Sequence, residues 1–179
     1  MKKIITIFGS SKPINNEDQY HIAYNLGKKL AKNGFDICTG GFNGIMEAAS
    51  RGAVESGGEA IGVTVDLWGR HTNQYITKEI KCITLFQRIE KLIGLGDGFV
   101  VLQGGTGTLL ELAAVWEYAN KDLMRIKPVA CHSSIWKVIV SEMNEQMKLE
   151  GRPADMVRAF DTIDEIVHYL IESLITTHS

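Results

Sequence analysis

Short apolar runs alternate with longer amphipathic stretches along most of the chain. The runs are rich in β-branched residues and are bounded by glycine or polar residues, a pattern typical of strands buried on both faces. We expect strands at 3–8, 35–39, 60–65, 79–84, 98–102 and 128–132. Apolar residues at helical spacing, or runs of small residues, predict helices at 16–32, 44–56, 86–95, 108–120, 134–149 and 161–175. This alternation predicts an open, doubly wound α/β fold with a parallel sheet and helices on both faces.

The length and charge are those of one ordinary globular domain, which we take as residues 1–179. The chain is 45% hydrophobic and 22% charged. Its 19 basic and 21 acidic side chains leave a net charge of −2, whereas a general nucleic-acid binder carries a basic excess. We therefore expect a ligand other than nucleic acid.

The sequence also argues against a membrane span, a signal peptide and a structural metal. No apolar run approaches the roughly 20 residues that a spanning helix needs, and the apolar part of 1–11 is too short for a signal peptide. Cys38, Cys82 and Cys131 lie far apart in or beside apolar runs, as expected for reduced thiols in a cytoplasmic protein. No two histidines have the spacing of a metal site on one helix.

Three glycine-containing turns follow strands that should end at the same edge of the sheet. They are 9–11, 39–44 and 104–108. In open α/β sheets the ligand binds at this edge, where the strand order reverses. The same residues would also suit tight turns that only pack, although three such turns at one edge favour a binding site.

The turn at 104–108 carries the sharpest signal. Glycines at 104, 105 and 107 let backbone amides approach a ligand closely. The helix that follows presents unpaired N–H groups and about half a positive charge at its N-terminus, which suits a phosphate. Thr106 and Thr108 add hydroxyl donors. We predict that Gly104, Gly105, Thr106, Gly107 and Thr108 bind a phosphate.

Two charged side chains accompany this turn. Glu111 follows it by about one helical turn. The helix dipole favours an acid there, but the acid also repels phosphate, so it makes sense if it faces a sugar. Arg88 begins the preceding helix just past a strand end and reaches the same edge, although a lone arginine is more often a solvated surface residue. Leu110, Val115 and Trp116 have the spacing of core positions.

Common nucleotide motifs are missing. The chain has no GxxxxGK[ST] sequence, which argues against P-loop kinase or ATPase chemistry. The first strand is followed by GSSKP rather than GxGxxG, and no acidic residue stands about 20 residues after the GGTGT turn to bind a ribose. An NAD-dependent dehydrogenase is therefore a weak interpretation.

The motif GGTGTLLE at 104–111 resembles the PGGxGTxxE motif of the LOG family, the cytokinin riboside 5′-monophosphate phosphoribohydrolases. Further matches are GSS at 9–11, LGKKLAKNG at 26–34, TGGFNGIMEAASRGA at 39–53, DGFVVL before the loop and KPV at 127–129. The resemblance covers roughly residues 4–135. It implies a Rossmann-like homodimer that needs no metal or cofactor, with both subunits contributing near each site.

The resemblance also implies an activity. Enzymes of this family cleave the N-glycosidic bond of a nucleoside 5′-monophosphate and release the free base and ribose 5-phosphate. Arg88 and Glu111 match the two catalytic positions of the family. Weaker nucleotide-binding candidates lie in the first two turns: Gly9, Ser10, Ser11, Gly41, Asn43 and Met46. The apolar character of 108–120 on more than one face also favours a homodimer, because it exceeds what packing on a sheet requires.

The chain departs from the family pattern at four positions. Gln103 replaces the proline of the motif, Ile89 the lysine after the arginine, Leu110 an acid, and Glu117 a threonine. The reaction class is thus a firmer expectation than a cytokinin substrate. An alternative is a binding or carrier protein for a phosphorylated ligand, like the molybdenum-cofactor carriers of this fold. A third is an interaction protein with a vestigial pocket.

Overall fold

Seven parallel strands form one sheet in the computed structural model, which describes residues 2–12, 17–66, 69 and 71–175. The strand order is β4-β3-β2-β1-β5-β6-β7, and every neighbouring pair is parallel. The strands are β1 (Ile4–Phe8), β2 (Asp36–Thr39), β3 (Ala60–Val65), β4 (Lys78–Cys82), β5 (Gly98–Val101), β6 (Val129–His132) and β7 (Val157–Phe160). The expected parallel α/β sheet is confirmed.

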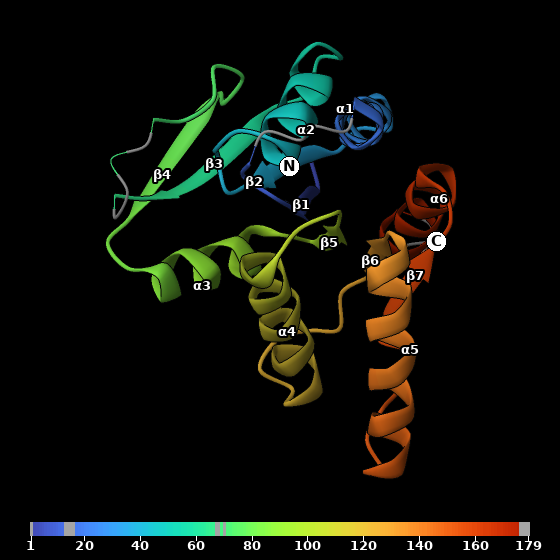
Figure 1. Cartoon of the computed structure of the whole chain (residues 1–179). Coiled ribbons are helices and arrows are strands. Elements are labelled where there is room, and N and C mark those ends of the chain that lie inside the picture. Colours follow the sequence, from blue (N-terminus) through green and yellow to red (C-terminus); the bar gives the residue numbers. More distant parts are fainter. Residues whose placement is uncertain (1, 13–16, 67–68, 70, 176–179) are drawn as a thin grey trace.

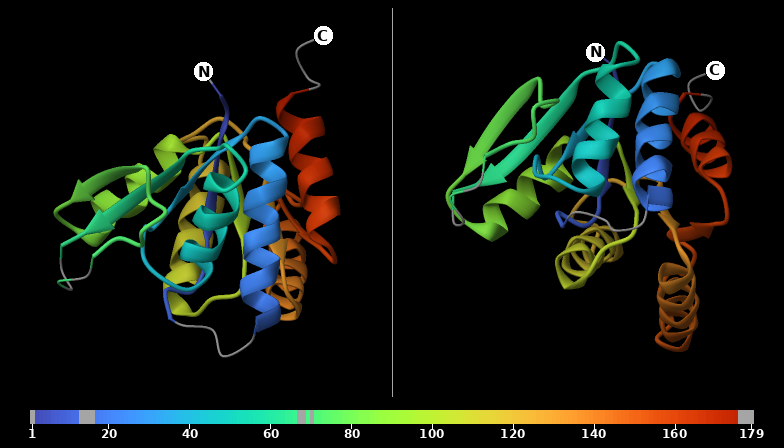
Figure 2. Two further views of the ribbon diagram at one scale, coloured as in Figure 1. Left: turned by 90° about the horizontal axis from the view of Figure 1, so that it is seen from above. Right: turned by 45° about the horizontal axis from the view of Figure 1, so that its top comes forward.

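Within these residues six helices cover the sheet in two layers. They are α1 (Glu17–Lys32), α2 (Ile45–Val54), α3 (Leu85–Leu95), α4 (Thr106–Asn120), α5 (Ser134–Leu149) and α6 (Ile163–Leu174). Helices α1, α2 and α6 pack on one face and α3, α4 and α5 on the other (Figures 1 and 2). No helix in the described part of the chain has the length and apolar character that crossing a membrane requires.

Side chains along β1 point alternately to the two faces of the sheet and pack against both helix layers. Ile5 and Ile7 are fully buried on the α1 side, while Phe8 belongs to the cluster on the opposite face. There the Phe8 ring stacks on Phe99 of β5, with ring centroids 5.9 Å apart. Burial on both faces explains why the strands read as continuous apolar runs.

Several boundaries differ from the sequence prediction. Helix α4 begins at Thr106, two residues earlier than expected, so Thr106 and Gly107 belong to its first turn. Strand β7 was not predicted, because its four residues include the exposed Arg158 and lack an apolar run. No helix separates β3 from β4 among the described residues between them. Thr162 forms a capping box with Glu165 at the start of α6.

The chain reverses its direction of strand addition beside β1. Strands β2, β3 and β4 are added on one side of β1, and then α3 leads back to β5 on the other side. At such a switch point the loops after the two central strands diverge and leave a crevice at their carboxyl ends. The loops after β1 and β5 are two of the three turns that the sequence singled out.

Candidate active site

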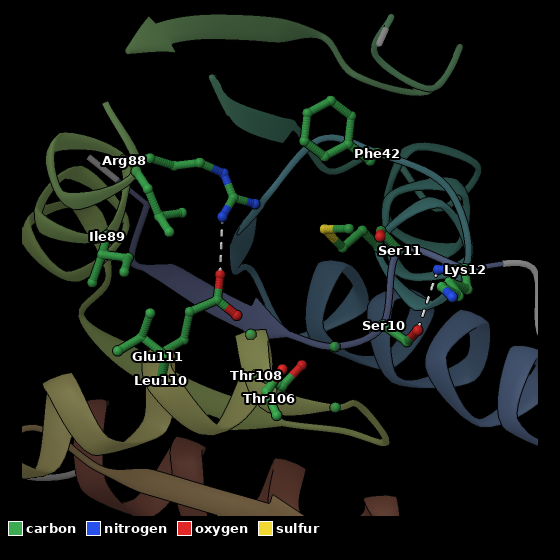
Figure 3. A pocket seen from close by; sticks show the side chains of 15 residues that line it. Ser10, Ser11, Lys12, Phe42, Arg88, Ile89, Thr106, Thr108, Leu110 and Glu111 are labelled. Carbon is green, nitrogen blue, oxygen red and sulfur yellow. Dashed lines mark hydrogen bonds and ion pairs between the residues drawn. The ribbon is translucent and has the colours of Figure 1, made fainter. Parts of the chain in front are cut away.

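A cavity of about 470 Å³ lies at this switch point (Figure 3). Its walls come from the loops after β1 and β2, from the first turns of α3, and from the start of α4. The lining residues are Gly9, Ser10, Ser11, Lys12, Phe42, Met46, Leu85, Arg88, Ile89, Gly105, Thr106, Gly107, Thr108, Leu110 and Glu111. The structure thus brings together most of the residues that the sequence predicted for the site.

Arg88 is a buried arginine held from two sides. Its Nη1 donates a hydrogen bond to Oε1 of Glu111 at 3.1 Å, and its Nε donates to the carbonyl oxygen of Val63 in β3 at 2.8 Å. Only 6% of the residue is exposed, so it is not a solvated surface residue. The guanidinium carbon also lies 5.9 Å from the centre of the Phe42 ring. These contacts fix the guanidinium in the cavity wall.

Gly40 makes the space that this guanidinium occupies. A Cβ atom at Gly40 would lie 1.7 Å from Nη2 of Arg88 and 2.7 Å from the sulfur of Met46. Neither distance is compatible with the present positions of those side chains. The glycine after β2 is therefore required by the placement of Arg88.

Glu111 is a buried carboxylate on the second turn of α4. It is 8% exposed, and burial raises its pKa from 4.5 to about 7, while the charge and hydrogen bond of Arg88 pull the pKa the other way. Desolvation is the larger effect because the surrounding protein solvates a carboxylate poorly. The result is a carboxyl group that changes its charge near neutral pH, as acid–base and electrostatic catalysts do.

The N-terminus of α4 opens into the same cavity. Its N-cap is Gly105, no side chain caps it, and its first turn carries no acid. The amides of Thr106, Gly107 and Thr108 therefore have no acceptor within the helix. A Cβ atom at Gly105 or Gly107 would meet nothing within 4 Å, so packing within the chain does not explain these two glycines.

The loop after β1 is bonded both to the start of α2 and to the loop after β5. The N–H of Ser10 donates to the carbonyl of Gln103 and the carbonyl of Ser10 accepts from the N–H of Ile45, both at 3.0 Å. Gly9 packs tightly under this loop, because a Cβ atom there would lie 2.3 Å from Cγ2 of Ile45. Backbone hydrogen bonds thus hold three walls of the cavity together.

Three of the predicted residues lie outside the cavity lining. The carbonyl of Gly41 accepts hydrogen bonds from the backbone and side chain of Asn73. Asn43 lines a neighbouring cavity of about 520 Å³, together with His71. A Cβ atom at Gly104 would lie 2.0 Å from Oγ1 of Thr108, so this glycine packs against the first turn of α4.

Four further residues line the cavity that the sequence pattern did not predict for the site: Lys12, Phe42, Leu85 and Ile89. Their places in the sequence were the one indication of this role, because they directly follow Ser11, Gly41, Thr84 and Arg88, which lie at the predicted edge of the sheet. The assignment of Leu110 to the core was wrong, because Leu110 is 40% exposed and lines the cavity. Neighbouring residues on a helix point in different directions, so Leu110 faces the open side of the cavity rather than the sheet.

The donor set of this cavity does not resemble a metal centre. Among the residues that the structure describes, no three histidine, cysteine, aspartate or glutamate side chains come together as a metal site. The cavity instead combines one buried ion pair with free helix amides and a partly apolar wall.

Comparison with known proteins assigns the chain to a family. The sequence profile of the SLOG cluster4 family matches residues 2–157. The chain belongs to the SLOG cluster4 family. Its LOG-like character, expected from the motif at 104–111, is confirmed by relatives named as LOG phosphoribohydrolases.

Relatives of this SLOG protein span different degrees of similarity. An uncharacterised protein from Archaeoglobus fulgidus is 26% identical over 88% of this chain and 89% of its own length. The cytokinin riboside 5′-monophosphate phosphoribohydrolase LOG of rice is 30% identical over 72% of this chain and 53% of its own length. The matches cover 48–63% of the length of the curated phosphoribohydrolases.

The SLOG protein shares its fold with a solved structure of a cofactor-binding protein. The molybdenum cofactor binding protein of the phototrophic bacterium Rippkaea orientalis superposes with a TM-score of 0.77, covering 98% of both chains at 24% identity. At this identity the similarity establishes the shared fold and nothing about the ligand.

Proposed function

We propose that this SLOG cluster4 protein hydrolyses the N-glycosidic bond of a nucleoside 5′-monophosphate and releases the free base and ribose 5-phosphate. One observation carries the proposal: the buried Arg88–Glu111 pair and the uncapped N-terminus of α4 line the same cavity. The name of the rice relative, a cytokinin riboside 5′-monophosphate phosphoribohydrolase, supports the proposal.

The 5′-phosphate binds at the start of α4. The amides of Thr106, Gly107 and Thr108 lack helical acceptors, and phosphate oxygens accept several hydrogen bonds at once. The open space at Gly105 and Gly107 allows the phosphate to approach the backbone closely. In this arrangement the ribose extends from the phosphate toward the second turn of the helix, where Glu111 lies.

Cleavage of the bond between C1′ and the base builds positive charge on the sugar. The ionised carboxylate of Glu111 stabilises that charge and orients the attacking water. Arg88 holds the carboxylate in place through Nη1 and favours its ionised form. The guanidinium is itself tethered to Val63, so the carboxylate does not need to reorganise during the reaction.

The base lies against the apolar side of the cavity. Phe42, Met46, Leu85, Ile89 and Leu110 form this side. Aromatic and aliphatic side chains suit a planar purine or pyrimidine. We propose that cytokinin nucleotides belong to the range of substrates to be tested, along with ordinary nucleoside monophosphates.

We also propose that the protein is a homodimer. Leu109 and Leu110 on α4 are 41% and 40% exposed, and Leu123 and Ile126 beyond its C-terminus are 67% and 75% exposed. Burial of such apolar groups against a second copy removes them from water.

A panel of nucleoside 5′-monophosphates, each paired with its nucleoside, tests the activity directly. The measurement is the free base released with time, separated by chromatography. We expect release from at least one monophosphate and little from its nucleoside. If the protein binds a nucleotide tightly and releases no base from any member of the panel, a carrier function replaces the hydrolase.

A further inference from the structure

The cavity carries one positive charge more than its buried ion pair accounts for. Three of the fifteen lining residues carry charge: Lys12, Arg88 and Glu111. Above neutral pH the carboxylate of Glu111 offsets the guanidinium of Arg88, because the two are hydrogen bonded at 3.1 Å. Lys12 then supplies the net positive charge of the cavity.

The backbone that presents Lys12 is fixed by its neighbours. The N–H of Lys12 donates to Oγ of Ser10 at 3.2 Å. On the other side Gly44 packs so closely that a Cβ atom there would lie 2.4 Å from the carbonyl oxygen of Lys12. Ser10 is in turn hydrogen bonded to Ile45 at the start of α2 and to Gln103 in the loop after β5. Lys12 therefore emerges from a defined point of the cavity wall.

The side chain of Lys12 is exposed and available for a ligand. No ion pair or side-chain hydrogen bond joins it to the residues whose side chains the structure describes. Figure 3 places Ser10 and Lys12 on the wall opposite Arg88, with Thr106 and Thr108 on the floor between them. A lysine there places a flexible, strongly charged ammonium group on the wall of the cavity into which the start of α4 opens.

We propose that Lys12 is the cation that binds the 5′-phosphate and makes the site select phosphorylated ligands. The inference rests on the proposed function for the position of the phosphate. It adds a second source of charge, because free amides alone provide only a partial positive charge for a dianion. Arg88 does not serve this purpose, because Glu111 and Val63 engage it on the opposite wall.

The test compares Lys12→Ala and Lys12→Arg with Lys32→Ala. Lys32 is an exposed lysine in the last turn of α1, so its loss gives the same change of net charge away from the cavity. Calorimetry measures binding of ribose 5-phosphate, and base release is followed for AMP and adenosine. We expect Lys12→Ala to weaken ribose 5-phosphate binding and raise KM for AMP about tenfold, as loss of a partly exposed charge-assisted hydrogen bond does.

The other arms separate a charge effect from a structural one. Lys12→Arg should stay within about threefold of the parent because it keeps the charge. The affinity of the parent should fall more steeply with added salt than that of Lys12→Ala, since screening acts on the charge that the variant lacks. The rate of base release from adenosine should be the same in the parent and in Lys12→Ala.

The outcomes distinguish the role of Lys12 from the proposed function. If the parent prefers AMP to adenosine but Lys12→Ala behaves like Lys32→Ala, the role of Lys12 is wrong and the function stands. If the parent binds neither ribose 5-phosphate nor AMP, both are wrong. A loss in Lys12→Ala that also affects adenosine equally would assign Lys12 to the structure of the loop and overturn its role as a phosphate ligand.

Discussion

Arg88 of α3 donates a hydrogen bond at 3.1 Å to Glu111 of α4, although 23 residues separate them in the sequence. The pair bridges the two helices that flank the switch point of the sheet. Burial makes it more than a surface contact, because neither charge has much water around it. The chemistry proposed for the cavity depends on this contact, and so do most of the predictions below.

Replacing Glu111 with Gln removes the charge and keeps the size. We expect turnover to fall on the order of 10²-fold or more, because the carboxylate stabilises charge that develops only in the transition state. Nucleotide binding should persist or tighten, since a carboxylate near a phosphate is repulsive. Glu117→Gln, an exposed site on the same helix, is the control. Equal turnover in parent and Glu111→Gln would remove Glu111 from the mechanism.

The raised pKa of Glu111 predicts opposite effects of pH on activity and stability. In the proposed mechanism the ionised form is the active one, so kcat/KM should rise through a pKa of about 7. In the unfolded chain the carboxyl group ionises near 4.5. Between these values the folded state holds a proton that the unfolded state has lost, so stability falls as the pH rises.

Thermal melts of the parent and Glu111→Gln between pH 4.5 and 8 check the second half of this prediction. The advantage of the parent at low pH should shrink as the pH approaches 7 and then level off. Parallel melting curves across the range would show that Glu111 has an ordinary pKa.

Gly40→Ala should displace Arg88 and crowd Met46, the two cavity-lining side chains nearest to the new methyl group. The new methyl group would lie 1.7 Å from the present position of Nη2, so the guanidinium has to move away from Glu111. We expect turnover to drop at least about tenfold, because misplacement of a positioned group by 1 Å is costly. Gly94→Ala is the matched control, since Gly94 lies in α3 with open space around it and alanine favours a helix.

Gly107→Ala separates folding from phosphate binding. The Cβ atom meets nothing in the free protein, and alanine in the first turn of a helix is well tolerated, so the melting temperature should be unchanged or slightly higher. The same methyl group would obstruct a phosphate at the helix amides. We expect AMP to bind about tenfold more weakly while adenosine is unaffected. Undiminished AMP affinity would place the phosphate elsewhere.

The proposed dimer predicts a light-scattering mass near twice 19.8 kDa. Leu109→Glu puts a charge on the exposed face of α4 and should shift the mass toward the monomer, because an unpaired charge at an apolar interface is costly. A monomeric mass for the parent at micromolar concentration contradicts the prediction.

The sequence predicted the sheet well because its strands are buried on both faces. Every strand except β7 begins and ends within two residues of its predicted boundaries. Strand β7 is a short edge strand without an apolar run, so no pattern predicted it. The early start of α4 was missed because Gly107 suggests a turn, yet it lies inside the first helical turn. The presence of a glycine does not by itself show whether that residue lies in a turn or in the first turn of a helix.

The site was predictable as a location and less so as a set of contacts. The edge of the sheet and the turn at 104–108 follow from strand order and glycine spacing. The contact of Arg88 with Val63 depends on how α3 packs on β3, which no local pattern contains. Lys12 lacked a recognisable motif, and Leu110 was misassigned because an apolar residue on a helix fits both a core and a cavity wall.

The two backbone hydrogen bonds of Ser10 have a consequence for engineering. They couple the loop after β1 to the start of α2 and to the loop after β5, so replacing the loop after β1 would disturb both neighbours. Leu85 and Leu110 instead reach the cavity as side chains from rigid helices. Variation in their size would reshape the space proposed for the base and leave the proposed phosphate site in place. Libraries for altered base preference should therefore randomise the helix positions and leave the loops intact.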